Sequence, residues 1–228
     1  MVKLKNDAIF IADSHYNKKR VTLLKLLKDI ESKKIECNQL FLCGDIFDFL
    51  SSQTTYFRNI NNSMIELINT ISFHIEVIYL EGNHDYNLKP LFPNSLIVPR
   101  DSQPLVIQHN EKNIKLSHGD IFTPIGYNIY CSIIRNHFFL KFLDIIDINY
   151  WLTYKIEQAL MKKSICQDQE KFESFTKKRL KAYNTDDLVI EGHFHQGYKD
   201  KHYINIPSLY CSNKYMVYKD KQFKFHML

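Results

Sequence analysis

The sequence predicts an α/β fold built around a largely parallel sheet, and three observations lead to that class. Short apolar runs rich in β-forming residues alternate, in the first part of the chain, with longer segments whose apolar residues recur at helical spacing. This order is typical of right-handed crossovers between parallel strands. A short polar sequence directly follows most of the apolar runs. With 228 residues, of which 45% are hydrophobic, the chain can bury the core of one domain, 1–228.

The first part of the chain alternates between strand and helix. Its continuous apolar runs predict buried strands, and each intervening segment carries one apolar face among polar residues. In chain order we expect a strand at 8–12, a helix at 17–34, a strand at 39–43, a helix at 56–72 and a strand at 75–80.

The rest of the chain predicts shorter strands and one long helical insertion. Residues 124–184 are expected to be almost wholly helical, with interruptions around 146–150 and 164–168; the first part is apolar on more than one face, and the second is amphipathic and basic. A long insertion at a strand end is usually functional or an oligomer contact. The further strands are expected at 96–98, 104–108, 113–117 and 188–191, followed by an antiparallel meander of 203–207, 215–218 and 223–227.

Composition narrows the class of protein only in part. The net charge of +5 suits an anionic substrate or membrane surface, and equally a lysine-rich soluble surface. The five cysteines are odd in number and form no C-x-x-C pair, which argues against a disulfide framework or zinc knuckle and favours a reducing cytoplasm. The N-terminal segment is charged where a signal peptide is apolar, and no run approaches the roughly 18 apolar residues of a membrane span, so neither export nor a spanning helix is expected.

Ligand-type residues follow five of the predicted strands. In an open α/β sheet the carboxyl ends of the strands converge on one crevice, so these side chains are expected to meet although they are far apart in the sequence. They are Asp13 and His15; Asp45 and Asp48; Asn83, His84 and Asp85; His118 and Asp120; and His193 and His195.

Oxygen and imidazole donors in one site suit Mn²⁺, Zn²⁺ or Fe²⁺. Two such ions about 3.5–4 Å apart can share a carboxylate and clamp a phosphoryl group during in-line attack. Each motif is weak alone, because GNHD at 82–85 is good turn chemistry and a single D-x-H is mostly an accident. The prediction depends on the joint occurrence of the motifs, each behind an apolar strand.

The five motifs resemble the pattern of the calcineurin-like metallophosphoesterases, which is D-x-H, G-D-x-x-D, G-N-H-[DE], H and G-H-x-H. Here they are DSH at 13–15, GDIFD at 44–48, GNHD at 82–85, HGD at 118–120 and GHFH at 192–195. The resemblance spans most of the chain. It implies a four-layer α/β/β/α sandwich with a helical insertion acting as a lid, and two divalent metal ions, with Mn²⁺ expected ahead of Zn²⁺ or Fe²⁺.

The resemblance also implies a role for each motif residue. His84 is expected to protonate the leaving oxygen or to stabilise the charge of the transition state, and Asp48 to orient it as a carboxylate orients an imidazole. The expected metal ligands form two sets that share one carboxylate: Asp13, His15 and His195 on one ion, Asn83, His118 and His193 on the other, and Asp45 between them.

The chain length and the insertion are similar to those of the UDP-2,3-diacylglucosamine hydrolases of lipid A synthesis, which cleave a UDP-sugar lipid at its pyrophosphate to give UMP. Such a substrate needs an apolar cleft beside a basic rim. Arg135, Lys162 and Lys163 are the expected substrate-binding residues, and Arg179 adds to the positive charge. The resemblance implies a lipid-linked UDP-sugar and an anionic membrane as partners, with the protein peripheral on the cytoplasmic face of the inner membrane. No obligate protein partner is evident in the sequence.

One residue departs from those hydrolases, because their best-known branch has arginine where this chain has His84. The alternative is therefore a soluble phosphodiesterase or phosphatase acting on nucleotides or another phosphate ester, with the insertion as an ordinary helical subdomain or dimer contact. A non-enzymatic scaffold is a further alternative, although the motifs lack none of their ligands. Nucleic acid is disfavoured as a substrate, because the basic residues alternate with aliphatic rather than aromatic side chains.

Overall fold

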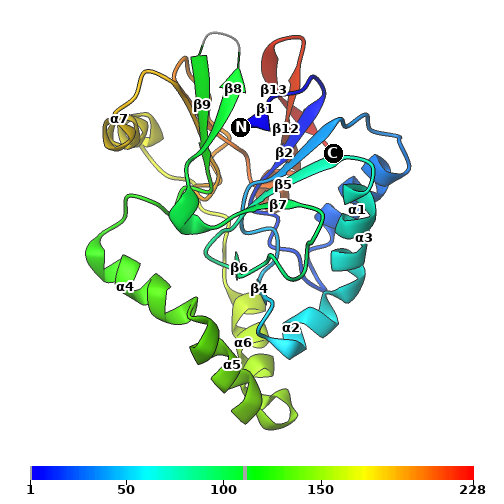
Figure 1. Cartoon of the computed structure of the whole chain (residues 1–228). Helices are drawn as coiled ribbons and strands as arrows, with labels where there is room; N and C mark the ends of the chain where they lie inside the picture. The colour runs from blue at the N-terminus through cyan, green and yellow to red at the C-terminus, as the bar shows by residue number, and fades with distance from the viewer. Residues whose placement is uncertain (1, 110–111) are drawn as a thin grey trace.

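The computed structural model describes residues 2–109 and 112–228, and within them two sheets lie face to face between helices (Figure 1). A short parallel pair, β4 (Leu50–Ser51) and β6 (Asp85–Tyr86), stands apart from both sheets. The six-stranded sheet has the order β13 (Gln222–Met227), β12 (Lys214–Lys219), β2 (Ala8–Ile11), β3 (Gln39–Leu42), β5 (Glu76–Leu80) and β7 (Leu96–Val98). The five-stranded sheet has the order β1 (Val2–Lys3), β8 (Leu105–His109), β9 (Lys112–Ser117), β10 (Leu188–Glu191) and β11 (Tyr203–Asn205).

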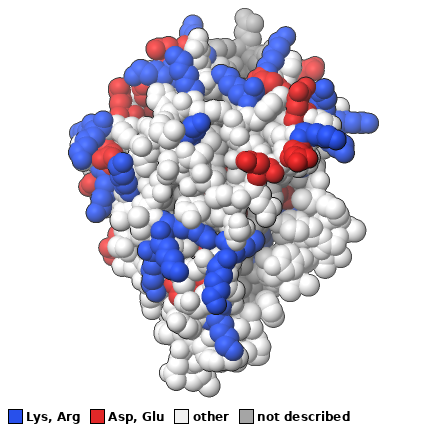
Figure 2. All heavy atoms as spheres, turned by 180° about the vertical axis from the view of Figure 1, so that it is seen from behind, with Lys and Arg blue, Asp and Glu red and all other residues white. Residues whose placement is uncertain are grey.

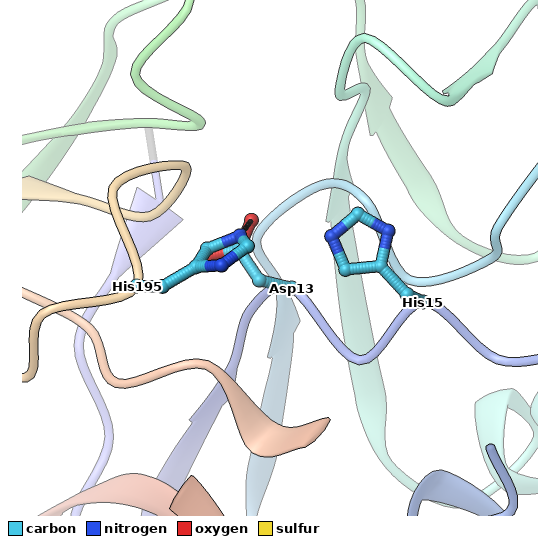
Figure 3. Close-up of side chains that lie close together, drawn as sticks. All are labelled: Asp13, His15 and His195. Atoms are coloured by element: carbon cyan, nitrogen blue, oxygen red, sulfur yellow. Dashed lines mark ion pairs between the residues drawn. The ribbon is translucent and has the colours of Figure 1, made fainter. Parts of the chain in front are cut away.

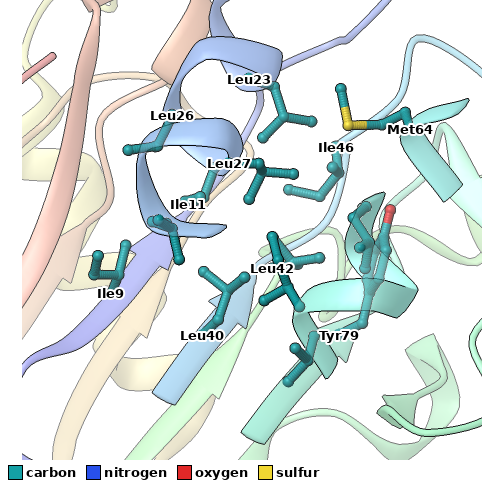
Figure 4. Close-up of a cluster of buried hydrophobic side chains, with 14 of the residues drawn as sticks. Ile9, Ile11, Leu23, Leu26, Leu27, Leu40, Leu42, Ile46, Met64 and Tyr79 are labelled. Carbon is teal, nitrogen blue, oxygen red and sulfur yellow. The ribbon is translucent and has the colours of Figure 1, made fainter. Parts of the chain in front are cut away.

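The apolar residues divide the molecule into four layers. Along β2, Ile9 and Ile11 point into a core with the helices α1 (Thr22–Glu31) and α3 (Asn62–Ser72), as Figure 4 shows. The intervening Phe10 belongs to a second core between the two sheets, because neighbouring side chains of a strand point to opposite faces. A third core lies between α7 (Phe172–Tyr183) and the outer face of the five-stranded sheet. The predicted α/β/β/α sandwich is confirmed.

The predicted helices of the first part differ from the observed ones at their ends. The helix expected over 17–34 covers only Thr22–Glu31, because the residues before it form a turn in which the Asn17 side chain accepts from the backbone of Arg20. The helix expected over 56–72 is two helices, α2 (Thr55–Ile60) and α3. They are separated at Asn61, whose side-chain amide donates to the carbonyl of Phe57 and so competes with regular helical bonding.

The tail follows the prediction only at its end. Strands β12 and β13 form an antiparallel hairpin, and β12 also pairs antiparallel with β2. The expectation of a meander is wrong for β11, which pairs parallel with β10 in the other sheet. The parallel order expected for the first part is confirmed, since β2, β3, β5 and β7 are parallel neighbours.

The predicted insertion contains two structurally different parts. Helices α4 (Ile125–Ile134), α5 (His137–Ile146) and α6 (Trp151–Lys162) project from the body as a helical arm, at the lower end of Figure 1. The arm is fixed at its base where Asp144 accepts from the backbone and hydroxyl of Thr55, at 2.7 Å each, and where Tyr56 donates to Glu157 at 2.6 Å. Helix α7, in contrast, is the outer layer of the sandwich. Three short helical segments lie between these elements: the 3-10 helices η1 (Arg100–Ser102) and η2 (Ile148–Tyr150), and the α-helix α8 (Leu209–Ser212).

The cysteines correct one expectation from the sequence. Cys166 and Cys211 form a disulfide, so the argument against disulfides is wrong for this pair, while Cys37, Cys43 and Cys131 are free. Spacing alone could not reveal it, because the two residues are 45 positions apart and meet only in the folded chain. Among the residues described, no helix has both the length and the apolar character needed to cross a bilayer.

Replacing Phe172 tests whether α7 is part of the body. Its ring is 7% exposed and packs against Phe175, Phe194 and Tyr203, so Phe172→Ala should lower the free energy of unfolding by about 3 kcal/mol through the lost burial and the cavity left behind. The matched control is Phe138→Ala on the arm, where the ring is 81% exposed and the change should stay within about 0.5 kcal/mol. Urea unfolding measures both, and equal losses would contradict the layer assignment.

Candidate active site

Residues from both sheets meet at the carboxyl edge of the sandwich. Asp13 follows β2 of one sheet and His195 follows β10 of the other, yet Nε2 of His195 lies 3.3 Å from Oδ1 of Asp13 (Figure 3). The backbone N–H of His193 donates to the other carboxylate oxygen at 2.8 Å. The ring of His15 completes this group, and the ligand atoms of Asp13, His15 and His195 all lie within 4.8 Å of one another.

A second group lies beside the first. The ligand atoms of Asp45, His118 and His193 are also within 4.8 Å of one another. Nε2 of His118 lies 3.2 Å from Oδ1 of Asn83, so the asparagine joins this group. Asp45 also forms a group with His15 and His84 and therefore stands between the two predicted ligand sets. The structure thus brings all seven predicted metal ligands together, with Asp45 close to residues of both predicted sets.

The donor atoms fit divalent cations. Oδ1 of Asp13 and both ring nitrogens of His15 are buried, and no described residue forms a hydrogen bond with them. The 3.3 Å approach of His195 to Oδ1 is an ion-pair distance without hydrogen-bond geometry. Buried polar atoms without partners are rare in folded proteins, and here they point into a cluster of carboxylates and imidazoles. A cation coordinated by Oδ1 of Asp13 and one ring nitrogen of His15 would satisfy those two atoms.

The protonation states of Asp13, His15 and His193 suit a cation site. Burial lowers the pKa of His15 well below its usual value and that of His193 to about 3. Burial alone would raise the pKa of Asp13, but His195, His118 and His15 lower it to about 2. Ionised carboxylate and neutral imidazole are the forms that coordinate metals. Three groups differ. Burial opposes the charge of His118, but Asp45, Asp120 and Asp13 raise its pKa to about 9. Burial also opposes the charge of His195, but Asp13 raises its pKa, and burial raises the pKa of Asp45, so a cation would compete with protons at these three residues.

The backbone around these groups is strained. Asp13, His15, Asp45, His193 and His195 all have positive φ, between 44° and 65°, a region that non-glycine residues seldom occupy. Each such residue costs on the order of 1 kcal/mol, and this kind of strain concentrates at functional sites. The turns that follow the strands therefore aim the side chains at one another at the expense of local stability.

Asp85 organises the loops that carry the ligands. Its buried carboxylate accepts from the backbone of Asp45 at 3.0 Å, of Ile46 at 2.7 Å and of Gly82 at 2.9 Å, and from the hydroxyl of Tyr79 at 2.6 Å. The last residue of the GNHD motif is thus bound to the GDIFD loop rather than turned toward the cation site.

The relation between Asp48 and His84 differs from the expectation. Nδ1 of His84 lies 2.7 Å from the backbone carbonyl of Asp48, so the carbonyl orients the imidazole and the predicted role of the carboxylate is wrong. The carboxylate instead accepts from Arg20 at 2.7 Å and from Asn17 at 2.8 Å, and it lies 3.7 Å from Nδ1 of His15. Sequence reasoning missed Arg20, because nothing in a lysine-rich segment marks one cation as buried.

The three predicted substrate-binding residues lie in different surroundings. Arg135 donates to the carbonyl of Gly82 at 2.7 Å and to Asp120 at 3.2 Å, and so holds the loop that carries Asn83. Lys163 lines two cavities that open at Asn83 and His84, beside the predicted metal ligands. Lys162 is exposed and lines neither cavity. A substrate role for Arg135, Lys162 and Lys163 stays a prediction.

Arg179 is not part of a basic surface. It is buried and forms an ion pair with Glu191, and its guanidinium also donates to the carbonyls of Gly119 and Ile121. Glu191 in turn accepts from the hydroxyl of Tyr203 at 2.7 Å. This network joins α7 to the turns after β9 and β10, which present His118 and His193.

The sequence profile of the calcineurin-like phosphoesterases matches residues 8–197, and the chain belongs to this family. It is thus a member of a phosphoesterase family, with His and Asp groups that can hold divalent metal ions. The matched range begins at β2 and ends just after His195, so it contains every motif residue described above.

The individual proteins that this chain resembles share low sequence identity with it. Proteins named UDP-2,3-diacylglucosamine hydrolase are similar in Proteus mirabilis (22% identical, over 82% of this chain and 81% of that protein), Aromatoleum aromaticum (23%, 79% and 70%) and Blochmanniella floridana (24%, 82% and 79%). Among solved structures, Yfce, a phosphoesterase from E. coli, aligns with a TM-score of 0.46 at 12% identity, covering 94% of this chain and 88% of that one.

Asp45→Asn tests the shared-ligand role and His84→Ala serves as its comparison. Removing the charge of Asp45 should weaken Mn²⁺ binding by more than about tenfold, because its carboxylate lies close to His15 of one predicted set and to His118 and His193 of the other. His84→Ala should lower the rate of phosphodiester hydrolysis and leave the metal content unchanged. Elemental analysis and Mn²⁺ titration of the purified variants measure this, with Asp101→Asn, an exposed carboxylate, as control. A fall in metal content with His84→Ala would show that His84 is a ligand instead.

Proposed function

We propose that this protein hydrolyses the pyrophosphate bond of UDP-2,3-diacylglucosamine, releasing UMP and 2,3-diacylglucosamine 1-phosphate. The observation that carries the proposal is an apolar cavity that opens beside the ligand cluster. Low-identity relatives that bear the name of this hydrolase support the same substrate.

The apolar cavity has a volume of about 480 Å³. Asn83 and His84 form its wall at the ligand cluster, and Lys163 lies at its edge. The helical arm supplies most of the remaining lining, through the apolar or aromatic side chains Tyr127, Tyr130, Ile134, Phe139, Leu140, Leu143, Ile156 and Leu160. A substrate that joins acyl chains to a pyrophosphate needs this combination, because its apolar part gains from leaving water while its phosphates have to reach the cations.

A smaller polar cavity of about 180 Å³ lies over the ligand cluster itself. Its lining includes Asp45, His193 and His195 on one side and Ser164 and Gln167 on the other. Lys163, Asn83 and His84 line both cavities. These shared residues mark the junction at which the scissile pyrophosphate would lie, with the nucleotide part in the polar cavity and the acyl part in the apolar one.

The proposed ligand sets are those expected from the motifs: Asp13, His15 and His195 for one ion, Asn83, His118 and His193 for the other, with Asp45 shared. Mn²⁺ is the proposed ion, since mixed oxygen and imidazole donors suit it. Two divalent ions bound here supply the positive charge that activates water and neutralises a phosphoryl group during in-line attack.

His84 is the proposed acid. The carbonyl of Asp48 can only accept, so Nδ1 of His84 carries a proton and Nε2 is left for the substrate. From the boundary between the two cavities, His84 protonated at both ring nitrogens can donate the Nε2 proton to the leaving oxygen, or a hydrogen bond from Nε2 to the developing charge. Proton transfer leaves the neutral imidazole with its remaining proton on Nδ1. The Lys163 ammonium at the same boundary can bind a phosphate oxygen that the cations do not reach.

We further propose that the arm docks on an anionic membrane. Its outer surface exposes large apolar side chains, including Ile125, Phe138, Ile145, Ile148 and Trp151. Figure 2 shows that the lower end of the molecule is largely without charge and that Lys and Arg side chains gather above it. Apolar groups at the interface with a basic belt behind them are the arrangement by which peripheral proteins bind anionic bilayers.

The competing candidate is a phosphodiesterase for a small soluble ester. The polar cavity alone would hold such a substrate, and His84 agrees with the general family pattern rather than with the arginine of the best-known lipid-specific branch. The two candidates differ in whether the apolar cavity contributes to turnover.

Leu143→Glu separates these candidates. Leu143 lines the apolar cavity, and a carboxylate there should lower the turnover of detergent-solubilised UDP-2,3-diacylglucosamine by more than about tenfold while bis(p-nitrophenyl) phosphate hydrolysis changes by less than about twofold. Ile145→Glu, two residues along the same helix but exposed, should leave both rates unchanged. EDTA should abolish both reactions and Mn²⁺ restore them. Equal rate losses on both substrates, or no hydrolysis of the lipid by the unmodified protein, would favour the soluble esterase.

The exposed tip of the arm is tested separately with vesicles. Ile145→Glu should lower co-sedimentation with phosphatidylglycerol vesicles several-fold, because it puts a negative charge on an apolar surface facing anionic lipid. Phe73→Glu removes an equally exposed apolar residue from the end of α3 and should not change binding. If both variants bind as the unmodified protein does, the arm is not the membrane contact.

A further inference from the structure

The segment 163–169, between α6 and α7, has neither helix nor strand and forms one wall of the polar cavity through Lys163, Ser164, Ile165 and Gln167. Its carbonyl at Ile165 lies 2.9 Å from Nδ1 of His195. A carbonyl there fixes the proton on Nδ1 and directs Nε2 toward Asp13, and contacts of this kind set both the orientation and the affinity of a coordinating histidine.

A disulfide connects this segment to the base of the site. Cys166 is bonded to Cys211 of α8, whose Sγ lies 3.9 Å from Nδ1 of His195. Helix α8 is itself held against the turn that carries Asp13. The hydroxyl of Ser208 donates to the carbonyl of Asp13 at 2.7 Å, and the backbone N–H of Leu209 donates to the carbonyl of Ala12 at 3.0 Å. The disulfide therefore fixes the residue next to Ile165 relative to Asp13.

The hydrogen bonds that hold the segment lie mostly at the surface. Gln196 donates to the carbonyl of Gln167 at 3.0 Å and accepts from the backbone of Gln169 at 2.9 Å, and Arg20 donates to the carbonyl of Lys163 at 3.2 Å. Water competes with exposed bonds of this kind, so the segment opens readily without a covalent link. Cys166 is exposed and can be reached by small thiols.

We propose that Cys166 and Cys211 are a reversible thiol pair that controls the positioning of His195, and thereby the affinity of the site for its cation. Formation of the disulfide transfers two electrons and two protons from the cysteine thiols to a low-molecular-weight disulfide such as oxidised glutathione, which leaves as two thiol molecules; reduction reverses the exchange. In the oxidised state the carbonyl of Ile165 stays on His195. In the reduced state the segment moves away more often, and His195 loses its orienting partner. The inference rests on the proposed metal role of His195 and not on the identity of the substrate.

The experiment is a Mn²⁺ titration of the metal-depleted full chain in glutathione buffers of graded redox potential, with alkylation and mass spectrometry to count thiols. Reduction should weaken the binding of one ion by about three- to tenfold, less than the roughly 10–100-fold loss from deleting such a contact outright. The affinity and the Cys166 alkylation should change with the same midpoint potential. A contact that only stabilised the fold would not produce this coincidence.

Three variants make the result decisive. Cys166→Ser and Cys211→Ser should show the weaker affinity at every potential, while Cys37→Ser, which removes a free thiol at the opposite end of β3, should keep the redox response. An affinity that is equal in both redox states, or a response that survives Cys166→Ser, would overturn the thiol switch and leave the metal site and the proposed hydrolase intact. Absence of Mn²⁺ binding in every state would overturn both.

Discussion

The close approach of the two sheets at their carboxyl edges is the constraint on which the site depends. Asp13 and Asp45 come from one sheet and His118 and His193 from the other, so the four can share cations only if the turns between them nearly touch. Glycine makes this possible: a Cβ at Gly44 would collide with the ring of His118, and one at Gly192 would lie 3.0 Å from that of Ala12 and 3.2 Å from the Asp13 carboxylate. Nδ1 of His118 then reaches the carbonyl of Cys43 at 3.0 Å, which fixes the imidazole across the junction of the sheets. The α/β/β/α arrangement thus matters here because it brings two sets of strand ends face to face.

Burying these groups close together lowers the stability of the fold, and the surrounding residues compensate for that loss. Five of the predicted ligands have left-handed backbone conformations, and the carboxylates of Asp13 and Asp45 are buried in the site. Asp85 compensates by receiving the backbone N–H groups of the loop after β3, and the Arg179–Glu191 pair holds the turns after β9 and β10 from behind. Bound cations would supply further compensation, by satisfying Oδ1 of Asp13 and one ring nitrogen of His15. The ligands are therefore positioned by a framework of buried polar groups that extends well beyond the motifs themselves.

The sequence predicted the parts of this protein that depend on local pattern. Apolar runs located the parallel strands, and the polar residues behind them located the cluster of carboxylates and imidazoles, since the ends of parallel strands have to converge. The parts that depend on tertiary contacts were not predictable from pattern. The parallel pairing of β11 and the packing of α7 depend on which surface each element meets. A basic amphipathic helix has the same sequence pattern whether it covers a sheet or faces solvent. Arg20, the carbonyl contact of His84 and the Cys166–Cys211 bond join residues that are distant in sequence or involve backbone atoms, on which residue type gives no information.

The proposed chemistry gives the helical arm two roles. Its inner side lines a cavity that ends at Asn83 and His84, while its outer side exposes apolar residues that water disfavours. A soluble ester would use neither side, and the exposed apolar surface would then have to serve another contact, such as the dimer contact considered above. A lipid-linked substrate uses both, because the acyl chains have to leave a bilayer and enter the cavity without crossing much water. The path along the arm is short on this view: lipid at the tip, apolar cavity behind it, Lys163 at the boundary and the cation ligands beyond. The physical case for a lipid pyrophosphate therefore rests on the apolar cavity that reaches Asn83 and His84, and the names of the distant relatives agree with it.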